Sequence, residues 1–516
     1  MTKELSLILP AEIAYVKSNL KKEIAKELSI QENDIVHINI VKRSVDARKK
    51  DIKIVLKAQV IVDEPNFKAY KPKFEYVDVT NKEHVIIVGA GPAGLYAALR
   101  LIEKGIKPII IERGKQVSER KIDIADIYKN NIIDPESNYC FGEGGAGAFS
   151  DGKLFTRSTK RGDVNRILEL LHYHGAKDEI LYETHPHIGT DKLPKIIQNI
   201  RETILEYGGE ILFETKLTDL IIENNKIKGI EINNSDKILG KAVILATGHS
   251  ADDIYELLFS KNIAIEAKPF AMGIRVEHSQ ELIDNVQYHG NRGKYLPAAS
   301  YSLSTQIDGR GVYSFCMCPG GFIVPSATSN NQLVVNGMSS SERNSKFANS
   351  GIAVEIRLED IPDIDKYGAL AGLKFQQQLE QTAYINSGKG QVAPVQFLAD
   401  FLKNKISAKI PETSYIPGVM SSPIHHWMPE IISDRLKKAF NIFNNKIRGF
   451  INPDAVIFAV ESRTSSTVRI PRNKETLQHI NIKGLYPCGE GAGYSGGIVS
   501  SAIDGVRCAE AISVDS

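Results

Sequence analysis

One stretch of the sequence constrains the fold more than any other. An apolar run over 85–88 leads into Gly-Ala-Gly-Pro-Ala-Gly at 89–94, and a helical pattern then continues to Gly105. A second apolar run over 108–111 ends in Glu112. This order of strand, Gly-x-Gly-x-x-Gly, helix, strand and acid is typical of a βαβ unit. The sequence therefore predicts a Rossmann-like α/β domain that binds a dinucleotide.

The positions of this motif have separate physical roles. Gly89 permits a tight turn, Gly91 lets the backbone approach a pyrophosphate, and Gly94 allows the helix to pack closely on the strand. The helix amino terminus offers free N–H groups and a favourable dipole to phosphate. Glu112 can accept hydrogen bonds from ribose hydroxyls. We expect this part of the site to comprise Gly89, Gly91, Pro92, Ala93, Gly94, Glu112 and Arg113.

Length and charge narrow the class of protein. A chain of 516 residues suggests about three domains at roughly 100–200 residues each. The balance of 64 basic against 62 acidic residues gives no global field that attracts nucleic acid. Five cysteines argue against a disulfide scaffold and fit a reducing compartment. Because we find neither a secretory signal pattern nor a membrane-spanning apolar run, we expect a cytoplasmic protein.

Three later segments bear on which dinucleotide the chain binds. They are a strand–turn–strand over 215–232, a strand over 242–245 that leads into Thr247 and Gly248, and a glycine-rich run over 489–497 before a helix. Together they resemble the FAD-binding fold shared by glutathione reductase, p-hydroxybenzoate hydroxylase and fumarate reductase-type flavoproteins. The resemblance implies that the last segment holds ribitol and flavin, with Glu490 where aspartate is usual. The helix that begins near Gly497 would direct its positive end at the flavin.

Four further segments carry a closer resemblance. They are Phe141–Leu154, which is glycine-rich, Cys316–Gly321, Val335–Ser339 and Glu461–Ser466. This set is similar to a bacterial family of uncharacterised FAD-dependent dehydrogenases, within the superfamily of NAD(P)/FAD-dependent oxidoreductases, and more distantly to geranylgeranyl reductases. The resemblance covers nearly the whole chain and implies FAD and redox chemistry without a substrate.

The glycine-rich loop can bring backbone N–H groups against phosphate or flavin; the alternative is a mobile surface loop. The further residues expected to contact the cofactor are Gly144, Gly145, Ser150, Leu217, Thr247, Gly248, Gly489, Glu490, Gly497 and Ile498.

The domain organisation follows from these segments. We predict a small N-terminal α+β domain of ferredoxin-like topology over 1–80 and an FAD-binding domain split between 81–265 and 451–516. An α+β substrate or cap domain is inserted over 266–450. No second strand–Gly-x-Gly-x-x-Gly–helix unit occurs between 255 and 480, so a dedicated NAD(P)H domain of the glutathione reductase kind is not expected.

The candidates for catalysis are Arg463, His278, Cys316 and Cys318. The two cysteines invite a redox-dithiol hypothesis. However, residues i and i+2 of a regular strand have Cα atoms about 6.5–7 Å apart, at the edge of disulfide reach, so packed thiols are the alternative. His278 can act as an acid or base or be structural. Arg463 can hold an anionic substrate or the flavin, or form an ordinary ion pair. We predict no metal site, since the histidine pairs 185/187 and 425/426 lack further ligands.

The sequence predicts a flavoenzyme that passes hydride through FAD on an unidentified small molecule, with NAD(P)H considered as a transient electron donor. The alternative is a flavoprotein that binds RNA through the N-terminal domain, whose segment 42–51 is basic. A solvated hairpin tip is the simpler interpretation of that segment. The oligomeric state stays open.

Overall fold

The segment 84–111 folds as the βαβ unit that its pattern predicts. In the computed structural model, which describes residues 1–64, 66–68, 72–156 and 161–513, strands β4 (His84–Val88) and β5 (Lys107–Ile111) flank helix α3 (Pro92–Glu103) and pair in parallel. They form the centre of a five-stranded parallel sheet in the order β22-β10-β4-β5-β6. The other strands are β6 (Glu210–Leu212), β10 (Val243–Leu245) and β22 (Leu485–Pro487). Because β22 pairs with β10, the two separated parts of the chain complete one sheet.

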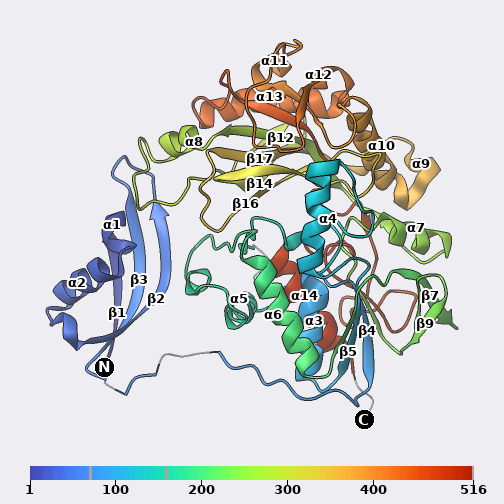
Figure 1. The fold of residues 1–516 in the computed structure, drawn as a ribbon, viewed down its shortest axis with the longest axis horizontal. Helices are drawn as coiled ribbons and strands as arrows, with labels where there is room; N and C mark the ends of the chain where they lie inside the picture. Colours follow the sequence, from blue (N-terminus) through green and yellow to red (C-terminus); the bar gives the residue numbers. More distant parts are fainter. Residues whose placement is uncertain (65, 69–71, 157–160, 514–516) are drawn as a thin grey trace.

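Both faces of this sheet are covered (Figure 1). One core contains apolar residues of α3 and of α4 (Val117–Asn130), α5 (Val164–Tyr173), α6 (Leu193–Glu206) and α14 (Ile498–Ala511). The other contains residues of the antiparallel sheet β7 (Leu217–Glu223), β8 (Lys226–Ile232) and β9 (Asp236–Leu239) and of α7 (Asp252–Ser260). Helices α3 and α14 cross so closely that a Cβ on Gly505 would lie 2.0 Å from the Ala93 carbonyl oxygen.

The second unit is built on a seven-stranded sheet in the order β13-β14-β17-β12-β20-β18-β19. Its strands are β12 (Phe270–Ser279), β13 (Ser304–Ile307), β14 (Arg310–Cys318), β17 (Phe347–Ile356), β18 (Ala393–Phe397), β19 (Val419–Ser421) and β20 (Val456–Glu461). A separate hairpin joins β15 (Gly321–Pro325) and β16 (Val335–Ser339). The helices are α8 (Gln280–Gln287), α9 (Ile364–Tyr367), α10 (Ala371–Ile385), α11 (Leu398–Leu402), α12 (Ile424–Trp427) and α13 (Glu430–Lys446).

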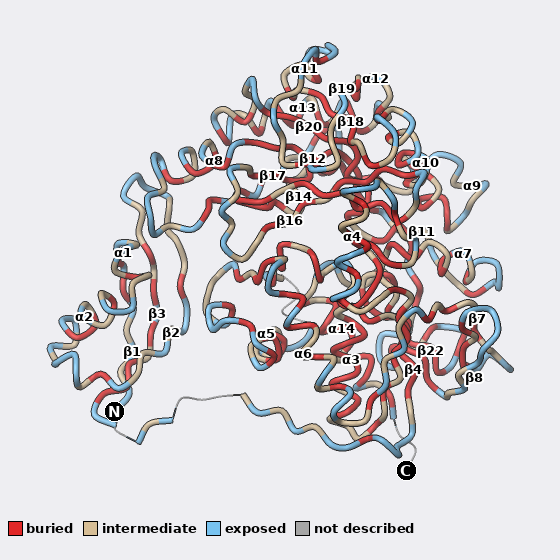
Figure 2. The backbone as a smooth tube through the Cα atoms, in the orientation of Figure 1, coloured by how far each residue is buried: buried red, intermediate tan, exposed pale blue. Residues whose placement is uncertain are grey.

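One boundary differs from the sequence prediction. Strand β20 pairs with β12 and β18, so the inserted sheet extends to Glu461 and does not end at 450. Short strands β11 (Glu266–Ala267) and β21 (Val468–Arg469) pair where the chain enters and leaves the unit. Figure 2 shows that buried residues follow the strands of both large sheets.

The N-terminal unit is the βαββ part of a ferredoxin-like fold. Strands β1 (Thr2–Leu9), β2 (Ile35–Asp46) and β3 (Lys53–Val62) form an antiparallel sheet in the order β1-β3-β2, with α1 (Ala11–Ala14) and α2 (Lys17–Leu28) between β1 and β2. A second helix and a fourth strand, which would complete that topology, do not occur among the described residues between β3 and β4. Residues 65 and 69–71, in the segment between β3 and β4, lie outside the described part of the chain.

Only the second half of the basic segment 42–51 connects β2 to β3, because its first half belongs to β2. Strand β2 continues through Asp46 because its residues 42–46 pair with 53–57 of β3. Arg43 is buried and forms an ion pair with Glu183, with 2.6 Å between Nη2 and Oε1. Its guanidinium lies 4.3 Å from the centroid of the Tyr15 ring, and its backbone N–H donates to the Tyr182 carbonyl oxygen. Arg43 therefore attaches the N-terminal unit to the rest of the protein and is not free to bind phosphate.

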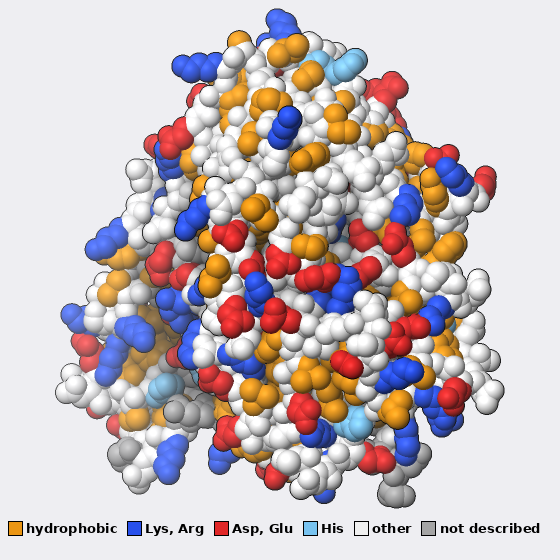
Figure 3. All heavy atoms as spheres, turned by 45° about the vertical axis from the view of Figure 1, so that its right-hand side comes forward, with side chains coloured by type: hydrophobic (Ala, Val, Ile, Leu, Met, Phe, Trp, Pro, Cys, Tyr) orange, Lys and Arg blue, Asp and Glu red, His pale blue; other side chains and the backbone are white. Residues whose placement is uncertain are grey.

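The surface seen in Figure 3 mixes acidic and basic side chains, in agreement with the near-zero net charge. Among the described residues, no helix is both long enough and apolar enough to cross a membrane.

The substitution Arg43→Ala should loosen the N-terminal unit. It removes a buried charged hydrogen-bond partner of Glu183, which costs about 1–3 kcal/mol. We expect faster limited proteolysis within 63–83 and a lower midpoint of thermal unfolding. Arg48→Ala is the control, since the ion pair of Arg48 with Asp46 is exposed and contributes little. Equal proteolysis of the two variants would contradict the attachment role.

Candidate functional site

A cavity of about 420 Å³ lies at the carboxyl ends of β4, β5 and β10, against the second unit. This volume is within the range of about 300–1,000 Å³ typical of small-molecule sites. The residues that line it come from stretches far apart in the chain, within 88–113, 140–155, 215–217, 246–254, 315–336, 463–464 and 490–501. Of the expected cofactor residues, those that line it are Gly89, Gly91, Pro92, Ala93, Glu112, Arg113, Gly145, Ser150, Leu217, Thr247, Gly248, Glu490, Gly497 and Ile498.

The remaining three expected cofactor residues, Gly94, Gly144 and Gly489, are not part of the lining. Gly94 packs behind the motif, where a Cβ would lie 1.9 Å from the carbonyl oxygen of Gly89. The Gly144 N–H donates to the Ala90 carbonyl oxygen, and the Gly489 N–H to Asp504. These glycines shape the backbone around the cavity.

Two helices begin at the cavity without a capping side chain. Gly91 precedes α3 and Gly497 precedes α14, and no described side chain accepts a hydrogen bond at either position. The first N–H groups of a helix have no partner within the helix, so these two ends present donors and positive dipoles. Both ends can therefore hold an anion or an electron-rich ring edge.

Glu112 joins the two glycine-rich loops. Its buried carboxylate accepts hydrogen bonds from Ala90 N at 2.8 Å and from Gly114 N and Gly142 N at 3.0 Å each. An ionised carboxylate has about four acceptor positions, so roughly one is left for a ligand hydroxyl. The expected bond to a ribose and this structural role are therefore compatible.

The glycine-rich loop over 142–147 is tightly held. Arg120 of α4 is fully buried and donates to the carbonyl oxygens of Asn138, Tyr139 and Glu143 at 2.7–2.9 Å. Gly142 has φ +110° and a Cβ there would lie 2.5 Å from the Arg120 side chain, so glycine is required. These contacts argue against the mobile-loop interpretation.

Arg463 reaches the cavity as half of a buried ion pair. Its Nε and Nη2 lie 3.0 Å from the Glu380 carboxylate oxygens, and Nη1 has no hydrogen-bond partner among the described residues. From the sequence, an ion pair and a contact with a ligand were alternative roles for Arg463. The structure shows the ion pair through Nε and Nη2 and leaves Nη1 available for a ligand.

His278 does not reach the cavity. It is buried in the second unit, and Nε2 lies 2.8 Å from the Phe450 carbonyl oxygen. Burial lowers the pKa of His278 to about 4, so the ring is neutral near pH 7. The structure gives it no route to a ligand in the cavity.

Cys316 lines the cavity, whereas Cys318 is completely buried and lies outside the lining. Lys153 of the glycine-rich loop also lines the cavity and lies close to both sulfur atoms.

Other lining residues had no individual signal in the sequence. Phe315, Asn336 and Thr464 contribute to the wall. All three lie in or beside the segments that carry the family resemblance. The resemblance therefore indicated these segments, but it did not indicate these individual residues.

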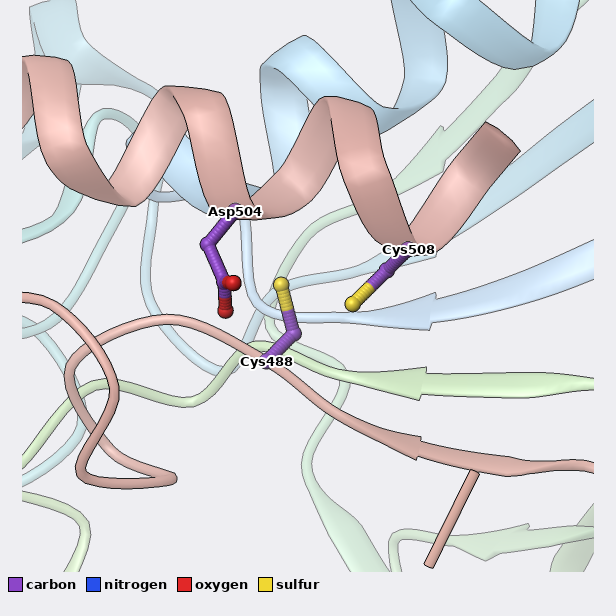
Figure 4. Close-up of side chains that lie close together, drawn as sticks. All are labelled: Cys488, Asp504 and Cys508. Atoms are coloured by element: carbon purple, nitrogen blue, oxygen red, sulfur yellow. The ribbon is translucent and has the colours of Figure 1, made fainter. Parts of the chain in front are cut away.

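Cys488, Asp504 and Cys508 point toward one another (Figure 4), and none of them lines the cavity. Their ligand atoms lie within 4.8 Å of one another, which makes them the one metal-like group found among the described residues. Arg472 already supplies the positive charge, because its Nη2 lies 2.6 Å from Asp504 Oδ1 and its Nη1 lies 3.5 Å from Cys508 Sγ. Since Asp504 also accepts from Gly489 N, the cluster fixes the loop after β22.

Three family models match the chain. They are described as "FAD-dependent protein, C-terminal domain-like" over 269–464, "Pyridine nucleotide-disulphide oxidoreductase" over 83–257, and a domain of unknown function over 1–61. An uncharacterised protein of Clostridium beijerinckii is 40% identical over 514 residues, which cover 96% of this chain and 95% of that one. A thiamine thiazole synthase of Aeropyrum pernix is 30% identical over 185 residues, 33% of this chain and 56% of its own.

Solved structures with a similar arrangement have low sequence identity. A geranylgeranyl bacteriochlorophyll reductase-like protein from Thermoplasma acidophilum has a TM-score of 0.34 at 12% identity, covering 83% of this chain and 78% of its own. The structure of CtdE in complex with FAD has a TM-score of 0.32 at 12% identity, covering 83% and 82%.

The substitution Glu112→Gln should destabilise the cavity wall. The amide NH2 of glutamine must face either Ala90 N–H or the two N–H groups of Gly114 and Gly142, which leaves buried donors unpaired. The expected cost is about 1–3 kcal/mol, measured as a lower midpoint of thermal unfolding of the ligand-free protein. Glu206→Gln, at an exposed position, is the control and should change little. An unchanged midpoint for Glu112→Gln would show that the carboxylate does not join the loops.

Proposed function

The chain belongs to the family of FAD-dependent oxidoreductases, and we propose that it holds FAD in the 420 Å³ cavity and transfers hydride to or from a small molecule bound there. The observation that carries the proposal is the convergence of Glu112 and two uncapped helix ends on one cavity. A dinucleotide needs donors for its phosphates, an acceptor for its ribose and a polar contact at its flavin.

The residues present fit this cofactor. The start of α3 would hold the pyrophosphate through backbone N–H groups, beside Gly91 and Gly145. The free acceptor position of Glu112 would take a ribose hydroxyl. The start of α14 would lie at the pyrimidine edge of the flavin, where its dipole stabilises negative charge. Since backbone N–H groups and helix dipoles would hold the phosphates and the flavin edge, the cavity needs no surplus of basic side chains.

When bound, FAD supplies an acceptor and donor of two electrons. A second molecule would lie beside Asn336, Arg463 and Thr464, which line the same cavity. The unpartnered Nη1 of Arg463 would orient an anionic or carbonyl group of that molecule. The inserted unit covers this side of the cavity and would keep water from the reacting atoms. NAD(P)H, as a transiently bound donor, is one candidate for the reductant.

The substitution Gly91→Ala separates cofactor binding from folding. Gly91 has an ordinary φ of −77°, and the nearest atom to a Cβ there is Gly145 Cα at 3.9 Å, so the chain accommodates alanine. The added methyl group would occupy the space of the pyrophosphate. We expect an unchanged thermal midpoint of the FAD-free protein and FAD binding weakened by about tenfold or more. Gly311→Ala, which also has room on β14, should bind FAD normally.

The reaction itself is tested by anaerobic reduction of the FAD-loaded protein with NADH, NADPH and a panel of small-molecule donors, followed by flavin absorbance. Bleaching by one donor and reoxidation by a second molecule would support hydride transfer. A purified protein that takes up no FAD would overturn the proposed site.

A further inference from the structure

Strand β14 departs from regular pairing at its two cysteines. Phe315 pairs with Gly351 of β17 and Cys318 with Asn349, so β14 has one residue more than β17 over this stretch. Cys316 adopts φ +46°, in the left-handed region that non-glycine residues rarely occupy. Such a bulge redirects side chains, and bulges and strained residues are common beside active sites.

The bulge brings both sulfur atoms to one ammonium group. Lys153 Nζ lies 3.5 Å from Cys318 Sγ and 3.9 Å from Cys316 Sγ. Cys318 Sγ also lies 3.2 Å from the Cys316 carbonyl oxygen, to which it donates. In a regular strand the two residues would stand side by side at the limit of disulfide reach. The bulge and the left-handed conformation of Cys316 depart from that regular geometry, and both sulfur atoms lie within 3.9 Å of the same nitrogen atom.

The charges around the pair favour one thiolate. Lys153 is held by Asp151 at 3.1 Å, and Arg275, which pairs with Glu461, donates to the Cys316 carbonyl oxygen at 3.2 Å. The neighbouring Cys318 side chain, with the charges of Lys153 and Arg275, holds the pKa of the Cys316 thiol well below its usual range. The interaction with the Cys316 side chain and burial raise the pKa of Cys318, which stays protonated.

The two thiols differ in access. Cys316 lines the cavity that we assign to FAD and its substrate, whereas Cys318 is 0% exposed. An accessible thiolate beside a buried thiol is the arrangement of an attacking and a resolving cysteine. Packing alone does not require a left-handed Cys316, a conformation that costs of the order of 1–3 kcal/mol.

We propose that Cys316 and Cys318 form a redox couple that exchanges two electrons with the bound flavin, with Cys316 facing the cavity and Cys318 as the resolving thiol. This inference rests on the proposed function. In the oxidising direction, an S–S bond forms between the thiolate and the thiol, and Cys318 releases its proton. The two electrons and that proton convert oxidised FAD to FADH⁻. In the reverse direction FADH⁻ returns them, the S–S bond breaks, and Cys316 thiolate and Cys318 thiol are restored.

The test is an anaerobic dithionite titration of the FAD-loaded protein after diamide oxidation and removal of diamide. The wild type should take up two electrons more per FAD than Cys316→Ser or Cys318→Ser. Peptide mapping by mass spectrometry should find a 316–318 disulfide in the oxidised wild type and in neither of these two serine variants. Cys508→Ser is the matched control, because Cys508 and Cys488 are a second close pair outside the cavity, and it should behave as the wild type.

A second variant tests the charge at the pair without removing a sulfur atom. Lys153→Met should raise the pH at which the ultraviolet absorbance of the thiolate appears and slow alkylation of Cys316 by iodoacetamide at neutral pH. Equal electron uptake by wild type and both serine variants, with FAD bound in all three, would overturn the redox couple and leave the proposed function intact. Failure of the wild-type protein to bind FAD would instead overturn the proposed function.

Discussion

The site depends on one buried carboxylate. Glu112 directly follows β5, and its two oxygen atoms accept hydrogen bonds from N–H groups of the Gly-x-Gly-x-x-Gly loop, of the turn after β5 and of the glycine-rich loop. These loops have few side chains of their own to fix them, so their shape comes from backbone hydrogen bonds. Arg120 holds the opposite, carbonyl side of the glycine-rich loop. An acid and a base thus fix the two faces of a backbone that would otherwise be free to vary.

The same use of buried ions recurs around the cavity. Arg275 pairs with Glu461, Arg463 with Glu380, and Arg472 with Asp504. Each pair joins segments distant in the chain, and each guanidinium keeps further donors for backbone or side-chain oxygen atoms. Buried pairs add little net stability, but removal of one member leaves an uncompensated charge. Their effect here is to fix the positions of the segments that surround the cavity, as the proposed function requires.

The sequence predicted those parts of the structure that local pattern determines. The βαβ unit and the helix from Ile498 are both present. What it did not predict depends on contacts between distant residues. The bulge at Cys316 arises from the pairing of β14 with β17. The second sheet extends to Glu461 because β20 pairs with β12. Arg43 is buried where it forms an ion pair with Glu183. No local signal marks any of the three.

The position of Lys153 shows why the two large units act as one site. This lysine belongs to the glycine-rich loop of the first unit, yet its ammonium group contacts two sulfur atoms of the second. Asp151, two residues earlier, pairs with Arg343 of the second unit and with Lys153 itself. A change in this loop would therefore change the charge beside the thiols, and a change at the thiols would act on the loop. Both effects pass through the same cluster of charges, formed by Asp151 and Lys153 of the first unit and Arg343 of the second, so the local structure at the cavity depends on both units.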